Sequence, residues 1–418
     1  MDNRKLTVFI HLDGEFCPAG ILGLTELNAA VQASAFSYGL RYLDRSNAIE
    51  IDPVSLSLES RETSRGKVLF PARGLTLFGG IRDAAPDGWG RRVIESRLKA
   101  PLNSLPESVY LLQAGSERMG ALDVRESPTS PAQTHARHSV RRLEYLLDAA
   151  NRIELGLAVP AQLEDIFDAG TSMGGMRPKA AVEDDNGVQW IAKFPSTADR
   201  LNVPLIEAAT MRLATQAGLD VPQVRSIDIG GRSVMLIQRF DRSTVNKMAR
   251  RHHMVSALTM LGCDESASMS KTYWDIADSI RRKAPAGSIE QDLKELFSRM
   301  VFNIFVTNDD DHLRNHAFLW NVEHKGWRLS PLFDVMPHAV IGTDRHLHLG
   351  VGDQGRFASL GNVLSGYGRF GLSLPQANEV IEQIWQVTRE WKTWFENWGV
   401  PGSEIDKIAP AFRHIDQI

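Results

Sequence analysis

A long helical pattern that runs directly into a polar, acidic segment is the feature of this sequence that most constrains its fold. The segment at 307–318 (TNDDDHLRNHAF) holds three aspartates together with histidine and asparagine. In residues 289–306, just before it, apolar side chains recur at the spacing of a helix with a buried face. These residues are Leu293, Leu296, Phe297, Met300, Val301, Ile304 and Phe305. The helix is therefore expected to deliver the acidic cluster at its C-terminal end.

Length and charge limit the classes of protein to which this chain can belong. At 418 residues it is too long for one ordinary core, so two or three domains or lobes are expected. A net charge of −4 argues against a protein that coats nucleic acid by itself. The basic run at 239–253 could contact phosphate, but a solvated face is the favoured interpretation.

The cysteines and the apolar runs indicate a soluble protein of the cytoplasm. Cys17 and Cys263 make neither a disulfide framework nor a zinc pattern, which fits a reducing compartment. The apolar run at 7–12 is interrupted by His11 and followed by acidic residues, so it is not typical of a signal peptide. No stretch approaches the roughly 20 apolar residues that span a bilayer, so no membrane contact is expected.

Local patterns predict a β-rich beginning, a mixed middle and a helical end. Residues 126–137, with two prolines and few apolar side chains, are the best linker candidate. The turn at 184–187 (Asp-Asp-Asn-Gly) predicts a hairpin. The other expected elements are a strand at 5–12, a helix at 89–99, a helix from 139 to 154, hairpin strands at 180–183 and 188–194, a helix at 204–217 capped by Gly218, a strand at 233–240, and mainly helices after about residue 250.

Three side chains at and after the acidic segment have the spacing of the catalytic and metal-binding set of protein-kinase-like phosphotransferases. Asp310 and Asn315 stand five residues apart, and Asp334 follows later in Leu-Phe-Asp-Val. In such enzymes the first Asp is the catalytic base, and the Asn and the later Asp bind magnesium. The spacing therefore favours Asp310 as the base, while Asp309 and Asp311 are expected to face solvent or cap the helix.

A glycine-rich loop and a lysine-bearing strand precede the acidic cluster. In the loop, 170–179, the adjacent Gly174 and Gly175 would let backbone N–H groups approach phosphate oxygens. Lys193 stands in Trp-Ile-Ala-Lys-Phe-Pro, and a lysine among apolar neighbours on a strand needs an anionic partner. Glu207, on the following helix, could pair with it or be a solvated helix glutamate.

A different chemistry remains open for the acidic cluster. Together with His312, its aspartates could form a metallohydrolase site, but that interpretation explains neither Lys193 nor the glycine-rich loop. In the kinase interpretation His312 is no metal ligand and could orient the loop through a hydrogen bond. The order of loop, lysine, base and later aspartate favours the kinase.

With these pieces in this order, the chain resembles the HipA family, which comprises serine/threonine kinases acting as toxins of bacterial type II toxin–antitoxin modules. The resemblance spans nearly the whole chain. Its matching stretches are PDGWGRR (86–92), GSERMGALDV (115–124), SMGGMRPKAA (172–181), WIAKFPS (190–196), LIQRFDR (236–242), NDDDHLRNHAF (308–318) and LSPLFDVMP (329–337).

The resemblance implies a role for each matched position. Ser172 falls where the family carries its autophosphorylated serine, and Asp310 falls on the catalytic base. Asn315 and Asp334 fall on the ligands of Mg²⁺. The positions implied to bind ATP are Ser172, Met173, Gly174, Gly175, Lys193, Gln238, Phe240, Asn315 and Asp334. The family often has an acid where Gln238 stands, and the loop here is richer in Gly and Arg than in well-known members.

The resemblance also implies an architecture. The expected fold is α+β and protein-kinase-like, with two lobes, a β-rich N-terminal segment and an α-helical C-lobe. The expected divisions are a β-rich subdomain at 1–137, an N-lobe with the loop and the ATP lysine at 138–240, and a catalytic C-lobe at 241–418. ATP is expected in the cleft between the lobes.

The partners implied by the family are a helix-turn-helix antitoxin of the HipB type, operator DNA mainly through that antitoxin, and a protein substrate such as an aminoacyl-tRNA synthetase. Two alternatives keep the fold: a small-molecule or lipid kinase, and a non-catalytic co-repressor that works with its antitoxin. Phosphorylated Ser172 would add about −1.5 to −2 charge to a loop that holds phosphates and so weaken nucleotide binding. Alternatively, Ser172 only hydrogen-bonds within its turn.

Overall fold

The computed structural model describes residues 1–133, 138–171, 175–245, 248–340 and 342–418. These residues form two compact units. Unit 1 comprises Met1–Thr197 with Gln238–Val255, and unit 2 comprises Ala198–Ile237 with Ser256–Ile418. Both contain helices and strands, which confirms the expected α+β class. The divisions expected at 137/138 and 240/241 stay a prediction.

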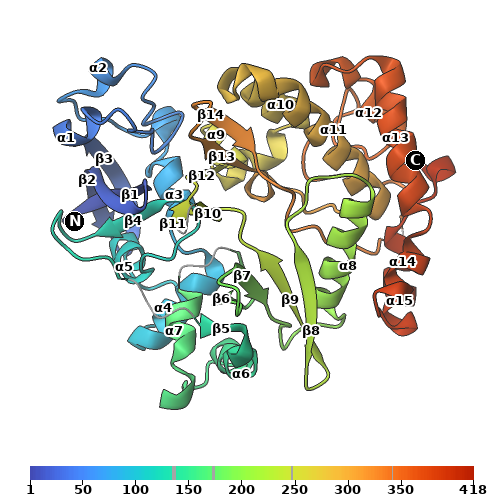
Figure 1. Cartoon of the computed structure of the whole chain (residues 1–418), viewed down its shortest axis with the longest axis horizontal. Coiled ribbons are helices and arrows are strands. Elements are labelled where there is room, and N and C mark those ends of the chain that lie inside the picture. Colours follow the sequence, from blue (N-terminus) through green and yellow to red (C-terminus); the bar gives the residue numbers. More distant parts are fainter. Residues whose placement is uncertain (134–137, 172–174, 246–247, 341) are drawn as a thin grey trace. The chain divides into compact units, whose positions relative to one another are not determined.

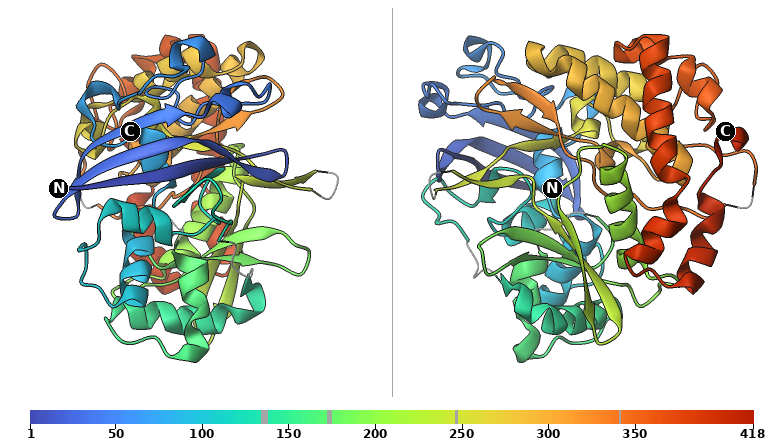
Figure 2. Two further views of the ribbon diagram at one scale, coloured as in Figure 1. Left: turned by 90° about the vertical axis from the view of Figure 1, so that its left-hand side faces the viewer. Right: turned by 45° about the vertical axis from the view of Figure 1, so that its right-hand side comes forward.

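Unit 1 begins with an antiparallel four-stranded sheet in the order β3-β2-β1-β4, whose long strands are seen in blue in Figure 2. β1 pairs along its whole length with β2, from Asp2 opposite Glu26 to Leu12 opposite Glu15. Val8 and Ile10 of β1 are fully buried, so this sheet forms a core of its own. The strands are β1 (Asp2–Leu12), β2 (Glu15–Leu27), β3 (Ala30–Tyr38) and β4 (Leu122–Arg125).

The expected hairpin at 180–194 is confirmed in unit 1. Strands β6 (Lys179–Glu183) and β7 (Gln189–Lys193) pair antiparallel, and Gly187 takes the left-handed φ of +76° that this turn requires. The remaining elements of unit 1 are β5 (His138–Ser139), β10 (Arg242–Val245), β11 (Met248–Arg251), α1 (Leu40–Leu43), α2 (Arg61–Ser64), α3 (Gly79–Ala84), α4 (Gly88–Leu98), α5 (Glu107–Gln113), α6 (Leu143–Glu154) and α7 (Asp165–Gly170). The helix expected from 139 is therefore α6, preceded by a 3₁₀ turn at 140–142.

The interpretation of the basic run at 239–253 as a solvated face is wrong. Arg239 and Arg251 are buried, with side-chain exposures of 1% and 9%, and Arg242 has 6%. Each of the three guanidinium groups pairs with a carboxylate of unit 1. Asp241 lies within the run itself, whereas Glu117 is brought to Arg251 by the fold.

Unit 2 is built around α11 (Ile289–Val306), the helix expected at 289–306, which packs between α10 (Tyr273–Lys283) and α13 (Leu374–Thr388) (Figure 1). All seven apolar positions expected on its buried face are buried, and so are Phe302 and Val306. Its C-terminal half is therefore buried on every side. The other elements are α8 (Val203–Gln216), α9 (Ala257–Met260), α12 (Leu360–Leu364), α14 (Trp391–Asn397), α15 (Gly402–Ile408), β8 (Val224–Ile229), β9 (Arg232–Gln238), β13 (Ala317–Asn321) and β14 (Gly326–Leu329). The first two residues of β12 (Met254–Ser256) are assigned to unit 1 and the last to unit 2.

The expected helix at 204–217 is confirmed as α8. The side chain of Asn202 accepts a hydrogen bond from the amide of Leu205, and Gly218 follows the helix with a φ of +89°. In the ranges described, no helix combines the length and the apolarity needed to cross a bilayer.

Candidate active site

The acidic segment begins where α11 stops abruptly. Thr307 takes a left-handed φ of +50°, an uncommon conformation for a β-branched residue that costs about 1–2 kcal/mol. Its hydroxyl donates to the carbonyl of Ala411, and Arg345 donates to that same hydroxyl. These buried contacts hold the turn that directs the following residues away from the helix axis.

Asp311 is the structural centre of the segment, so its expected position in solvent or at a helix cap is wrong. It is 2% exposed, and its Oδ2 accepts hydrogen bonds from the Tyr273 hydroxyl, from Nδ2 of Asn303 at 2.8 Å and from Nε2 of His316 at 2.9 Å. Burial alone would raise the pKa of Asp311, but His316 and Tyr273 together hold the pKa below its ordinary value. The carboxylate thus fastens the segment to α10 and α11.

Asp310 has the opposite environment, although it is the adjacent residue. It is exposed, and its carboxylate makes no hydrogen bond or ion pair with the part of the chain that the structure describes. The Asp310 carbonyl accepts from the backbone amide of His312 at 2.8 Å and from Nδ2 of Asn315 at 3.0 Å. The backbone of Asp310 is therefore fixed while its side chain stays available to a substrate.

Asn315 is held so that its oxygen is the available atom. The residue is 5% exposed, and because Nδ2 donates to Asp310, Oδ1 is left as an acceptor with no donor in the described ranges. An amide oxygen of this kind suits Mg²⁺. The offset of five residues between Asp310 and Asn315, expected from sequence, thus corresponds to a direct contact.

Asp334 lies in an irregular stretch after β14 that returns to the acidic segment. The backbone amide of His338 donates to the carbonyl of Thr307 at 3.0 Å, and Nδ1 of His338 lies 2.9 Å from Oδ2 of Asp309. Asp334 itself is exposed and has a left-handed φ of +61°. Its neighbours therefore bring this stretch beside the loop that carries Asp310.

His312 does not orient the loop through its side chain, as had been expected. Its ring lies edge-on to His348, with centroids 5.8 Å apart, and makes no hydrogen bond to the described residues. The histidine that hydrogen-bonds in this loop is His316, and sequence spacing did not distinguish it. Tyr273 and Asn303 were also missed, because their role depends on how α10 and α11 pack.

In unit 1, the end of the glycine-rich loop is fastened to the start of α4. Asp87 caps α4 by accepting from Gly88 at 2.8 Å, and its other oxygen accepts from the amide of Gly175 at 3.3 Å. The backbone amide of Trp89 donates to the carbonyl of Gly175 at 2.9 Å, and its indole donates to the carbonyl of Lys179 at 2.8 Å. The stretch Pro-Asp-Gly-Trp-Gly therefore supports the loop directly.

Two lysines lie opposite each other at the end of the β6–β7 hairpin. Lys193, the last residue of β7, is half-buried and pairs in register with Lys179, which is 9% exposed. Gly175, with a φ of +84°, passes so close to the Lys179 ammonium that a Cβ there would collide with Nζ. Lysine ammonium groups form charge-assisted hydrogen bonds with anions, so this end of the hairpin suits an anionic ligand.

The remaining expected site residues have mixed outcomes. Glu207 of α8 is 4% exposed, so the alternative of a solvated glutamate is wrong. Gln238 ends β9, and the following Phe240 is half-buried. The residues Ser172, Met173 and Gly174 lie outside the described part of the chain.

Comparisons with known proteins identify a family that matches this chain and a solved structure that shares its fold. A family described as the HipA-like C-terminal domain matches residues 171–391, which include the lysine strand and the acidic segment. A chain of the solved Shewanella oneidensis MR-1 complex of HipA, HipB and its operator DNA superposes with a TM-score of 0.66. The superposition covers 97% of this chain and 94% of that one at 16% identity, which shows a shared fold.

Two curated relatives of low sequence identity carry the name "Putative kinase". This chain is 28% identical over 151 residues to the "Putative kinase Y4mE" of Sinorhizobium fredii, which is 35% of this chain and 34% of that protein. It is 27% identical over 183 residues to a "Putative kinase" of Haemophilus influenzae, which is 40% of this chain and 52% of that protein. The matches thus span between a third and about half of these relatives' lengths.

The α+β fold is of the kinase-like class, and both of these relatives are named "Putative kinase". Because the matched family covers residues 171–391, more than half of the 418, the chain belongs to the HipA-like C-terminal domain family.

Proposed function

We propose that this protein is an ATP- and Mg²⁺-dependent serine/threonine protein kinase that acts as the toxin of a type II toxin–antitoxin module. The observation that carries the proposal is the contrast within the acidic segment. Asp311 is buried and hydrogen-bonded three times, whereas Asp310 is exposed, unpaired among the described residues and backed by Asn315. A rigid loop that presents one available carboxylate is what a catalytic base requires.

In the proposed reaction, the carboxylate of Asp310 orients a substrate hydroxyl and accepts its proton. The hydroxyl oxygen forms a bond to the γ-phosphorus of ATP as the bond between that phosphorus and the β,γ-bridging oxygen breaks, so that ADP leaves. The protein contributes mainly position and charge to this transfer, because the reaction needs little covalent chemistry from it.

The residues present fit Mg²⁺. Magnesium is commonly held by one or two protein oxygens together with substrate phosphates. Oδ1 of Asn315 and the carboxylate of Asp334 would supply those oxygens, and the ion would neutralise charge on the phosphates. No group of three or more His, Cys, Asp or Glu side chains suited to a metal occurs in the described ranges, which disfavours the metallohydrolase alternative.

Unit 1 would supply the charge that binds the ATP phosphates. The opposed Lys179 and Lys193, with the backbone at Gly175, form a positive end of the hairpin. We assign the adenine contact to the backbone at Gln238 and Phe240, as the family pattern implies. Autophosphorylation of Ser172 belongs to the same proposal and rests on the family pattern alone.

For the substrate and the partner, the proposal follows the family. The substrate would be a protein, such as an aminoacyl-tRNA synthetase. The partner would be a helix-turn-helix antitoxin of the HipB type that brings the complex to operator DNA, as in the solved Shewanella assembly. A small-molecule or lipid kinase would use the same residues, because the base needs only a hydroxyl within reach.

Labelled ATP separates these possibilities. The protein and its Asp310→Ala variant are each incubated with a bacterial lysate and [γ-³²P]ATP, and label in protein and in small molecules is measured separately. The proposal expects label in protein with the unchanged enzyme and none above background with the variant. Label only in small molecules would support the small-molecule kinase. Absence of any transfer, together with tight binding of an antitoxin, would support the co-repressor.

A further inference from the structure

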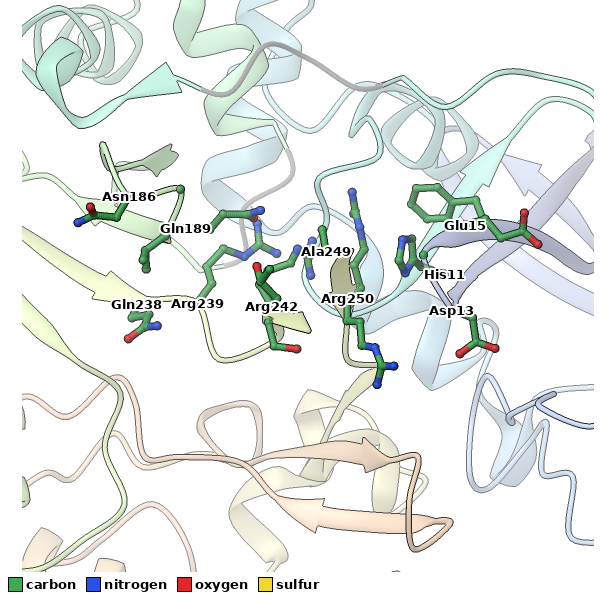
Figure 3. Close-up of a pocket in the computed structure, with 17 residues that line it drawn as sticks. His11, Asp13, Glu15, Asn186, Gln189, Gln238, Arg239, Arg242, Ala249 and Arg250 are labelled. Carbon is green, nitrogen blue, oxygen red and sulfur yellow. The ribbon is translucent and has the colours of Figure 1, made fainter. Parts of the chain in front are cut away.

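A polar cavity lies wholly within unit 1. It has a volume of about 790 Å³ and is lined by residues around the β1–β2 turn and the β6–β7 turn, by Gln238 and Arg239, and by parts of β10 and β11 (Figure 3). None of the residues proposed for catalysis or for metal binding lines it. Among the described residues of the proposed nucleotide site, Gln238 also lines this cavity.

Buried arginines dominate the chemistry of this cavity, which we call the arginine pocket. Arg239 and Arg242 both pair with Asp241, at 2.8 Å and 2.7 Å, and Arg251 pairs with Glu117 at 2.9 Å. Three guanidinium charges therefore face two carboxylates, which leaves one positive charge unbalanced. In Figure 3, Arg239 and Arg242 lie together between Gln189 and His11.

The terminal nitrogens of Arg239 and Arg242 already donate to Asp241 and to backbone carbonyls, but one buried donor of the cluster has no acceptor in the described ranges. Burial, and then the neighbouring guanidinium of Arg239, lower the pKa of Arg242 well below its usual value. The buried Nε of Arg242 also has no hydrogen-bond acceptor among the residues described. Arg250, at the rim, makes no ion pair or side-chain hydrogen bond to the described chain.

The other charged groups at the pocket do not supply the missing negative charge. The carboxylates of Asp13 and Glu15 point away from the arginines in Figure 3. Asp13 accepts from Asn47 at 2.6 Å, and Glu15 lies 3.7 Å from Arg45. Burial, followed by Arg251, lowers the pKa of His11 to about 4, so its ring is neutral near pH 7.

We propose that the arginine pocket binds a small phosphate-bearing ligand, a function additional to the phosphate transfer proposed above. Guanidinium groups bind phosphate oxygens through paired hydrogen bonds, and a cavity of this volume is of the size that holds small molecules. Nucleic acid is disfavoured, because its backbone is bound by exposed basic stripes. Here the three ion-paired arginines are at most 9% exposed, in a chain of net charge −4.

The test is calorimetric titration of the full chain with pyrophosphate, after the proposed ATP site has been saturated with a non-hydrolysable ATP analogue. One pyrophosphate is expected to bind per chain. Arg250→Gln, which breaks no contact of the described chain, is expected to weaken binding about threefold. Arg251→Gln combined with Glu117→Gln, which removes both members of an ion pair, is expected to weaken it at least tenfold.

Lys67→Gln is the matched control, because it removes an exposed cation of unit 1 outside the pocket and is expected to leave this affinity unchanged. The proposal is overturned if the saturated protein binds no pyrophosphate, or if the arginine variants bind it as tightly as the unchanged protein. It is also overturned if a 20-base-pair DNA duplex binds more tightly than pyrophosphate through these same arginines, since the pocket would then serve nucleic acid.

Discussion

Asp310 and Asp311 are adjacent, but their carboxylates are in different environments. The carboxylate of Asp311 is enclosed by hydrogen-bond donors from α10, α11 and the residue that precedes β13. The carboxylate of Asp310 points to solvent on a backbone fixed by Asn315. The sequence predicted the importance of Asp310 through its spacing, but burial separated the two residues only once the helices were packed.

Replacing these two residues should therefore affect different properties. Asp311→Ala leaves the buried donors of Tyr273, Asn303 and His316 without an acceptor, so we expect the free energy of unfolding to fall by about 3–5 kcal/mol. Asp310→Ala removes no contact with the described residues and should change it by less than about 0.5 kcal/mol. Urea unfolding measures the free energy of unfolding of both variants. An equal loss in the two variants would contradict the structural role given to Asp311.

His253 makes the stability of unit 1 dependent on pH. The residue is 2% exposed, and burial lowers its pKa to about 4 despite a hydrogen bond to the carbonyl of Ile51. Below the ordinary value of about 6.5 the unfolded chain binds this proton and the folded chain does not, so stability falls as the pH falls from about 6.5 to 4. We expect a loss of about 2 kcal/mol between pH 7 and pH 5 from this residue. In urea unfolding at pH 7 and pH 5, His253→Gln should lose about 2 kcal/mol less stability between the two pH values than the unchanged protein. The same loss in both proteins would contradict the role of His253.

At the scale of elements, the glycine-rich loop depends on α4 as much as on its own sequence. Asp87 and Trp89, at the start of that helix, hold Gly175 and the beginning of β6 through hydrogen bonds. The loop and α4 are far apart in the sequence, and they form one support in unit 1. This support explains why the loop can pass so close to the ammonium group of Lys179.

Gly175→Ala tests that close approach. The added Cβ collides with Nζ of Lys179 and must displace it, so we expect ATP to bind about tenfold more weakly, a change of about 1.4 kcal/mol. Gly187→Ala is the matched control, because Gly187 has a similar φ of +76° with nothing within 4 Å of the added Cβ. In both variants the strained backbone should lower the free energy of unfolding by about 1 kcal/mol. Only Gly175→Ala should also lower the affinity for ATP, which a titration measures. Equal affinities in the two variants would contradict a role for Lys179.

Elements with a strong local pattern could be predicted from the sequence. The apolar period predicted α11, the Asn-Gly turn predicted the β6–β7 hairpin, and an N-terminal proline with a capping glycine predicted α8. Features that depend on distant pairing could not be predicted in this way. The burial of Arg239 and Arg242 requires Asp241 and Gly120 to meet across more than a hundred residues, and no local pattern contains that information.

At the scale of the whole molecule, neither compact unit is a continuous stretch of chain. The chain leaves unit 1 after Thr197, returns at Gln238 and leaves again after Val255. The proposed phosphate-binding lysines belong to unit 1, and the proposed base and magnesium ligands belong to unit 2. The proposed activity therefore needs the full chain, and its most direct test is a change in unit 2 that affects transfer while ATP binding is retained.

That test measures phosphate transfer and ATP affinity in Asp310→Asn and in Asp309→Asn. Both variants remove one carboxylate from the same loop, but the one pair that Asp309 makes with the described residues is an exposed one with His338. The kinase proposal predicts that Asp310→Asn slows transfer by about 10²–10⁴-fold with ATP affinity nearly unchanged, while Asp309→Asn keeps its rate within about threefold. Transfer by Asp310→Asn at the rate of the unchanged protein would contradict the proposal.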